Sequence, residues 1–184
     1  MPEPLRRIFW FVNKFFMVPM FRLGLGFLFG NPLSGYIMVI KVRGRKSGKL
    51  RLAPVNYALQ DGMIYCISGG RRSSDWFKNL LANPRIELIL PAGAIYGAVE
   101  EVPVEDVHRL ALIRQVLKNA GFAGYFEGYN PNTISEADLA NKSADLPLLR
   151  IRPMGLGSGA GDAGGWAWFW TVLLSTWLAW LIFR

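Results

Sequence analysis

A basic segment between two apolar runs constrains the fold of this chain more than any other feature. Residues 36–42 and 52–59 are rich in β-branched side chains, and the segment between them contains Gly44 and Gly48. This pattern predicts two strands joined by a turn, because glycine adopts the positive φ angles that tight turns require. The segment carries four cations, Arg45, Lys46, Lys49 and Arg51. They predict a site for a phosphate or carboxylate, and the alternative is a solvated hairpin tip.

Short apolar segments continue along the middle of the chain. We expect further strands at residues 63–67, 86–90, 94–102 and 148–151. Asp61 and Gly62 predict a hairpin turn, and Asp75 predicts the start of a helix that ends before Pro84. Residues 104–120 predict a longer helix with His108 on its exposed side. Six short strands with few helices predict an α+β, mainly β fold, organised as a closed or partly closed barrel.

The C-terminal region resembles a membrane anchor. Residues 166–183 carry no charge and are followed by Arg184, and tryptophans lie toward both ends of this stretch. A helix of this length approaches the hydrocarbon thickness of a bilayer. Residues 155–165 are mostly glycine and predict a flexible linker. We therefore expect a single-pass C-terminal anchor in the cell membrane. Because every charge except that of Arg184 precedes the stretch, the positive-inside rule predicts that the domain faces the cytoplasm.

The N-terminal region predicts a second membrane contact. Its apolar positions follow helical spacing, with Arg6, Arg7, Asn13 and Lys14 on the opposite side. A basic helix rich in aromatic residues is expected to lie in the bilayer interface; the alternative is a helix packed on the domain core. The expected organisation is therefore an interfacial helix at residues 1–30, a barrel domain at 31–154, the linker at 155–165 and the anchor at 166–184.

Composition limits the chemistry of the chain. The formal net charge of +8 predicts an anionic partner. Cys66 is the single cysteine and lies in an apolar run, which predicts a core residue without a disulfide. His108 is the single histidine, so no Cys/His spacing supports a metal site. Nucleic acid is not expected as a partner, because no aromatic residues interleave the cations of the basic turn.

Four sequence blocks together resemble a known family. They are Gly44-Arg45-Lys46-Ser47-Gly48-Lys49-x-Arg51-x-x-Pro54, the Asp61-Gly62 hairpin, Ser68-Gly69-Gly70 and Trp76-x-x-Asn79-Leu80-x-Ala82-Asn83-Pro84. In order and spacing they resemble the deazaflavin-dependent nitroreductase family over roughly residues 36–153. The resemblance implies a split β-barrel of the flavin-reductase type. It also implies binding of the reduced deazaflavin coenzyme F420, a phosphorylated and polyglutamylated hydride donor, with flavin mononucleotide as the alternative cofactor.

The resemblance also implies which residues hold the coenzyme and the acceptor. The implied cofactor-binding residues are Arg45, Lys46, Ser47, Arg51, Pro54, Ser68, Gly69, Gly70 and Trp76. Tyr125, Tyr129 and Ser68 are the candidate catalytic residues, as proton donors or hydrogen-bond donors to the acceptor. The chain departs from the family where Gly69 replaces a lysine found in some active members and where Asn56 replaces a tyrosine. Arg71 and Arg72 are the candidate replacements for the missing cation.

The expected function is hydride transfer from the reduced deazaflavin to a lipophilic acceptor such as a quinone, next to membrane lipid. The alternative is a non-catalytic module that binds flavin or haem, or an accessory subunit of a membrane complex, because fold does not fix function. A homodimer is also possible, since related barrels often pair.

Overall fold

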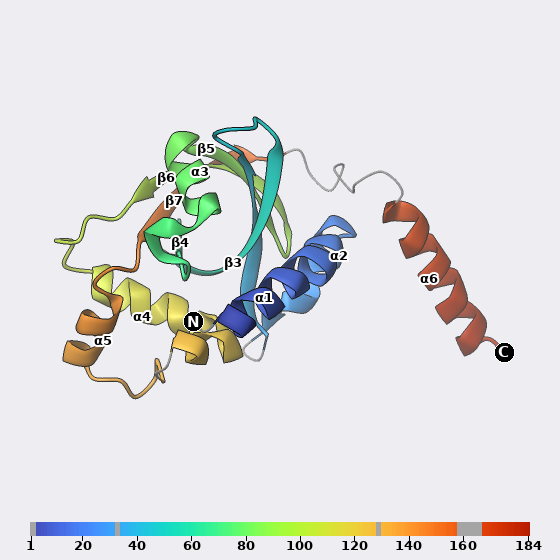
Figure 1. The fold of residues 1–184 in the computed structure, drawn as a ribbon. Helices are drawn as coiled ribbons and strands as arrows, with labels where there is room; N and C mark the ends of the chain where they lie inside the picture. Colours follow the sequence, from blue (N-terminus) through green and yellow to red (C-terminus); the bar gives the residue numbers. More distant parts are fainter. Residues whose placement is uncertain (1–2, 32–33, 128–129, 158–166) are drawn as a thin grey trace.

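Six strands close into an antiparallel barrel. The computed structural model describes residues 3–31, 34–127, 130–157 and 167–184. The barrel strands are β2 (Gly35–Arg43), β3 (Leu50–Gln60), β4 (Met63–Ile67), β5 (Arg85–Leu90), β6 (Gly93–Glu101) and β7 (Leu148–Leu156). They pair in the order β2-β3-β4-β7-β6-β5, and the pairing of β5 with β2 closes the ring (Figure 1). The prediction of a mainly β barrel is confirmed.

Both predicted hairpin turns are present. The basic turn joins β2 to β3, with Gly48 at a φ of 65° and a 2.9 Å hydrogen bond from the Gly44 N–H to the Lys49 carbonyl. Asp61 and Gly62 join β3 to β4 with φ angles of 51° and 74°. Two successive positive φ angles are typical of a type I′ turn, whose twist matches that of the strands.

The barrel interior forms the main hydrophobic core. Inward side chains of the strands, such as Met38, Ile40 and Leu88, pack with Phe77 and Leu80 of the helix α3 (Asp75–Ala82). The short helix η3 (Arg71–Ser73) precedes α3. Cys66 is fully buried in this core, and burial raises the pKa of its thiol to about 12. Cys66 is therefore the core residue that its apolar surroundings predict.

Two helices lie outside the barrel, one packed on β3 and β4 and the other packed against the first. These are α4 (Arg109–Asn119) and α5 (Glu136–Ser143), and their buried residues form a second cluster with Ala58, Tyr65 and Leu148. The helix expected at 104–120 begins at Arg109 instead, because the Asp106 carboxylate accepts a 2.8 Å hydrogen bond from the His108 N–H and holds the preceding residues in a turn. His108 is exposed, as expected. The helix α5 was not predicted.

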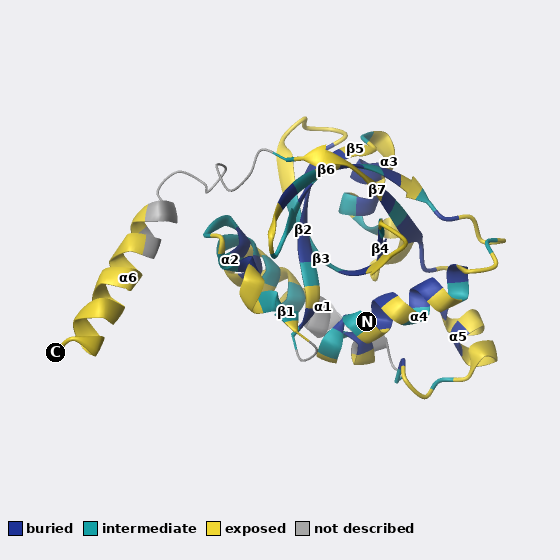
Figure 2. Ribbon diagram, turned by 180° about the vertical axis from the view of Figure 1, so that it is seen from behind, coloured by how far each residue is buried: buried dark blue, intermediate teal, exposed yellow. Residues whose placement is uncertain are grey.

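The N-terminal segment, residues 3–29, packs along the barrel. It consists of α1 (Glu3–Val12), the π-helical η1 (Asn13–Met17), α2 (Val18–Arg22) and the 3-10 helix η2 (Leu25–Phe29), followed by the short β1 (Gly30–Asn31), which pairs with β2. Met17 and Phe21 are buried against Val39 of β2. In the structure this segment is therefore packed on the domain core, which is the alternative arrangement. Ile8, Trp10, Phe11 and Phe15 of the same segment remain exposed. Figure 2 shows the resulting mixture of buried, intermediate and exposed residues around α2.

The expected transmembrane anchor is not supported. The C-terminal helix α6 (Ala167–Ile182) has 16 residues, about 24 Å at 1.5 Å per residue, against a hydrocarbon thickness of about 30 Å. Within the described ranges, no helix combines the length and apolarity needed to cross a membrane. The prediction of a single-pass anchor with a cytoplasmic domain is therefore wrong. The strand β7 also continues to Leu156, so the expected linker begins with strand residues, and residues 158–165 lie outside the described residues.

Candidate active site

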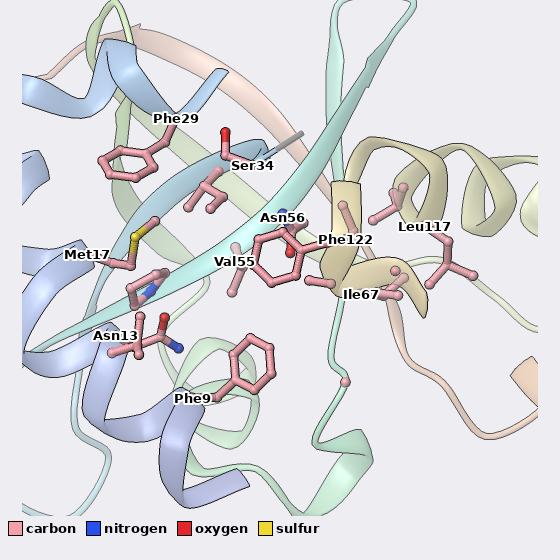
Figure 3. A pocket seen from close by; sticks show the side chains of 18 of the residues that line it. Phe9, Asn13, Met17, Phe29, Ser34, Val55, Asn56, Ile67, Leu117 and Phe122 are labelled. Atoms are coloured by element: carbon pink, nitrogen blue, oxygen red, sulfur yellow. The ribbon is translucent and has the colours of Figure 1, made fainter. Parts of the chain in front are cut away.

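A cavity of about 390 Å³ lies between the N-terminal segment and the barrel (Figure 3). One wall comes from the N-terminal segment, with Phe9, Asn13 and Met17 among its residues. The strand β3 supplies Pro54, Val55 and Asn56, the β4–α3 connection supplies Gly69 with Trp76 of α3, and the end of α4 and η4 (Gly121–Glu127) supply Leu117 and Phe122. The lining is mostly apolar, so the cavity suits an apolar ligand.

Three of the predicted cofactor residues line this cavity. They are Pro54, Gly69 and Trp76, and Trp76 also packs against the barrel core. Gly70 follows Gly69 directly and is exposed. These residues come from a strand, a turn and a helix that only the folded barrel brings together.

Ser68 is buried and is not among the residues that line the cavity. Its side chain is fully buried, and its hydroxyl donates a 2.9 Å hydrogen bond to the Arg71 carbonyl and shares a 2.8 Å hydrogen bond with the Ser74 hydroxyl. Ser74 lies directly before α3. The Ser68 hydroxyl therefore fixes the turn that presents Gly69, and it is not among the groups that line the cavity.

Arg45 binds the basic turn to α3. Its backbone N–H and its Nη1 atom donate hydrogen bonds of 3.1 and 2.9 Å to Asn79 Oδ1, and Nη2 contacts Asp75 Oδ1 at 3.0 Å. The hydrogen bond and charge of Arg45, with smaller contributions from Lys78 and Lys46, lower the pKa of the Asp75 carboxyl. The Arg45 charge is thus already paired, which makes this residue a support of the turn.

The other cations of the turn are available to an anion. No carboxylate in the described part of the chain forms an ion pair with Lys46, Lys49 or Arg51, and all three side chains are exposed. Ser47 accepts a 3.4 Å hydrogen bond from the Lys49 N–H, which shapes the tip of the turn. Arg51 lies on β3, three residues before Pro54, so about 10 Å of strand separates the cations from the cavity wall.

The arginines expected to replace the missing family lysine are paired. Arg71 forms an ion pair with Asp145, and Arg72 forms one with Glu101 of β6. Both pairs are partly exposed to solvent. Their positive charge is therefore offset locally, unlike that of Lys46, Lys49 and Arg51 on the basic turn.

Of the two candidate tyrosines, the structure describes one. Tyr125 is half exposed, and its hydroxyl accepts a 3.4 Å hydrogen bond from Asn132 Nδ2. It follows the cavity residues Phe122 and Gly124 on η4 but does not itself line the cavity. Tyr129 lies outside the described residues.

Sequence reasoning missed the wall that the N-terminal segment contributes. Asn13 was expected on a solvent-facing polar side, yet it lines the cavity with Phe9 and Met17 at intervals of four residues. The segment is apolar on both sides, so periodicity alone does not identify the side that packs on the barrel.

Comparisons with known proteins give three kinds of result. No curated protein sequence matches the chain. Among solved structures, an F420-H2 dependent reductase (FDR-A) is 20% identical, with coverage of 62% of this chain and 91% of that one and a TM-score of 0.44. A second, described as F420 reductase, is 18% identical, with coverage of 67% and 90% and a TM-score of 0.43. The haem storage protein HutZ from Vibrio cholerae is 10% identical, with coverage of 75% and 88% and a TM-score of 0.46. Similarity at this level says nothing about activity.

A family model gives the decisive match. The model described as F420H(2)-dependent quinone reductase matches residues 19–132, which is more than half of the 184 residues. The matched region contains the basic turn, the Gly69 turn, α3 and most of the cavity wall. The chain belongs to the F420H(2)-dependent quinone reductase family.

Proposed function

We propose that this protein transfers a hydride from reduced coenzyme F420 to a quinone-class acceptor bound in the cavity beneath the N-terminal segment. Family membership supports deazaflavin-dependent oxidoreduction. The observation that carries the choice of acceptor is the cavity itself, whose walls are mostly hydrophobic side chains. The transfer of an apolar ring system from water to such a site is favourable in free energy.

The residues present fit the coenzyme. Its aromatic ring system is compatible with the wall formed by Pro54, Gly69 and Trp76, where the glycine leaves the backbone open to close approach. Its anionic tail is compatible with the unpaired cations of the basic turn. This turn leads into β3, a few residues before Pro54. When bound, the reduced coenzyme supplies the hydride. The cations then hold the tail, and the apolar walls exclude water from the ring.

The proton that accompanies the hydride needs a second source. Of the predicted donors, the Ser68 hydroxyl is already bonded to Arg71 and Ser74, and Tyr129 lies outside the described residues. Tyr125 combines a solvent-exposed hydroxyl with a position beside the cavity residues of η4. We therefore assign Tyr125 to proton delivery from solvent.

The outer side of the N-terminal segment suits contact with lipid. Ile8, Trp10, Phe11 and Phe15 are each more than half exposed. The Lys14 ammonium lies 4.7 Å from the Trp10 ring centroid and 5.1 Å from that of Phe15. Aromatic side chains beside a cation are typical of interfacial helices. Because the same segment forms a wall of the cavity, a lipophilic acceptor in the lipid would lie close to its binding site.

The function is tested by mixing the full chain with reduced coenzyme F420 and a short-chain quinone and following the return of the oxidised coenzyme. We expect reduction well above the protein-free rate. Ala123→Trp should abolish it by filling the cavity, whereas Ala140→Trp, on the exposed side of α5, should not. Coenzyme binding without reduction of any quinone would contradict the proposal and support an accessory role.

The lipid contact is tested separately by co-sedimentation with vesicles of phosphatidylcholine and phosphatidylglycerol. A double variant, Trp10→Ser with Phe15→Ser, should show a lower bound fraction, because both rings are exposed in the structure. A variant with Val107 replaced by serine is the control, since Val107 is 87% exposed but lies on the turn before α4. Equal binding of the two variants would contradict a lipid-facing role for the N-terminal segment.

A further inference from the structure

The polar side chains of the cavity are few, and not all of them have a partner within the described residues. Among the residues that line the cavity, Asn13, Ser34 and Asn56 carry polar side chains, and Trp76 adds an indole N–H. The Ser34 hydroxyl donates to the Gly35 carbonyl at 3.4 Å, and Asn56 Nδ2 donates to the Tyr36 carbonyl at 3.4 Å. Neither the Asn13 carboxamide nor the Trp76 indole N–H makes a hydrogen bond within the described part of the chain. Of the two, only the carboxamide can both donate and accept a hydrogen bond, so it is a polar group that a bound molecule can satisfy.

The position of Asn13 in the segment is unusual for asparagine. It begins the π-helical turn η1, with helix on both sides, where asparagine is a poor helix former. π-helical turns are rare and occur frequently at functional sites. Local structure therefore disfavours an asparagine at this position. Phe9 and Met17, which lie four residues before and after it, also line the cavity (Figure 3).

We infer that Asn13 is a specificity-determining residue whose side-chain amide donates a hydrogen bond to a carbonyl oxygen of the acceptor. This inference rests on the proposed function and adds the group that distinguishes a carbonyl-bearing ring from a plain hydrocarbon. In this mostly apolar cavity, a hydrocarbon leaves the Asn13 amide unpaired, whereas a quinone satisfies it. The same hydrogen bond stabilises the negative charge that develops on the carbonyl oxygen as hydride is received.

Equilibrium binding without the coenzyme isolates this role from turnover. The probes are 2-methyl-1,4-naphthoquinone and 2-methylnaphthalene, which share ring size and differ in the two carbonyl groups. Quenching of tryptophan fluorescence reports quinone binding, and competition reports the hydrocarbon. The wild-type chain should prefer the quinone. Asn13→Leu should weaken quinone binding by about 3- to 10-fold, as expected for one hydrogen bond, and leave hydrocarbon binding unchanged or tighter.

Two further variants make the test specific. Asn13→Asp keeps the size of the side chain and removes its donor, so it should weaken quinone binding at least as much as Asn13→Leu. Asn141→Leu makes the same chemical change on an exposed position of α5 and should have no effect. Leucine is also the better helix former, so loss of folding does not explain a change at position 13.

The outcomes separate this inference from the proposed function. If the wild-type chain reduces quinones but Asn13→Leu keeps the same quinone preference and the same KM, the role of Asn13 is refuted and the function stands. If the wild-type chain neither binds nor reduces quinones, both fail. A raised KM for the quinone in Asn13→Leu, with unchanged affinity for the coenzyme, together with the lost preference supports the inference.

Discussion

Replacing Asn79 with alanine removes the acceptor that holds Arg45 against α3. Asn79 is 6% exposed, and its Oδ1 atom accepts hydrogen bonds from both the Arg45 backbone N–H and the Arg45 Nη1 atom. In the variant the guanidinium can turn to solvent, but the backbone N–H stays in a partly buried place. An unpaired buried donor costs about 1–3 kcal/mol, so we expect a loss of about 2 kcal/mol in the free energy of unfolding.

Urea denaturation of the full chain measures this loss through the midpoint at an unchanged slope. A thermal melt should fall by about 4–8 °C, at about 2–4 °C per kcal/mol for a domain of this size. Asn141→Ala is the matched control, because Asn141 is exposed on α5 and should change stability by less than about 0.5 kcal/mol. Arg45→Ala introduced into the Asn79→Ala background should cost less than it does in the wild-type chain.

The same substitution has an expected consequence for binding. The turn between β2 and β3 carries the unpaired cations proposed to hold the coenzyme tail, and Arg45 fixes that turn to the helix that bears Trp76. We therefore expect weaker coenzyme binding by the folded Asn79→Ala variant in a fluorescence titration. A loss of stability below about 0.5 kcal/mol in Asn79→Ala would refute the structural reasoning, because it would show that the Arg45 contacts contribute nothing.

Three further predictions follow from the structure. Lys46→Ala should weaken coenzyme binding and reduce its dependence on salt without changing stability, because Lys46 is exposed and in no ion pair among the described residues; titrations at two salt concentrations measure this. Burial raises the pKa of the Cys66 thiol to about 12 from an ordinary value of 9.0, so the thiol of the unfolded chain loses its proton at lower pH. The free energy of unfolding should therefore fall by about 1.4 kcal/mol per pH unit above about pH 9. In urea melts at pH 8 to 10.5, Cys66→Ala should lose that contribution to the slope. Gly35→Ala should destabilise the fold far more than Gly62→Ala, because both glycines have positive φ angles but only at Gly35 would a Cβ atom lie 2.7 Å from the Ala120 backbone; thermal melts of the two variants compare them.

The barrel was predictable because its signals are local. Alternating and β-branched runs predict every barrel strand. Asp61 and Gly62 predict the turn between β3 and β4, because few residue pairs adopt two successive positive φ angles. The helix α5 was missed because its eight residues carry little apolar periodicity, although Ser135 caps it through a 3.1 Å hydrogen bond from the Asp138 N–H. The role of Arg45 in holding the turn against α3 could not be predicted from local sequence either, because its partner Asn79 lies 34 residues away.

The C-terminal helix shows how composition alone misleads. Residues 166–183 lack charge, and the tryptophans suggest interfacial belts, but the helix that forms has only 16 residues. Counting apolar residues assumes that all of them join one helix. The helix Ala167–Ile182 ends before Phe183, which leaves it short of the span that the count implied.

The N-terminal segment was ambiguous for a physical reason. A helix with apolar residues on two sides satisfies the periodicity of a membrane-surface helix and that of a core-packed helix at once. The structure shows both patterns in one segment: Met17 and Phe21 are buried against β2, while Trp10 and Phe15 remain exposed. Only the tertiary contact distinguishes the two sides, and it places Asn13 on the cavity wall. Asn13, which the sequence pattern assigns to a polar side of the helix, is therefore the residue that we expect to determine specificity for the acceptor.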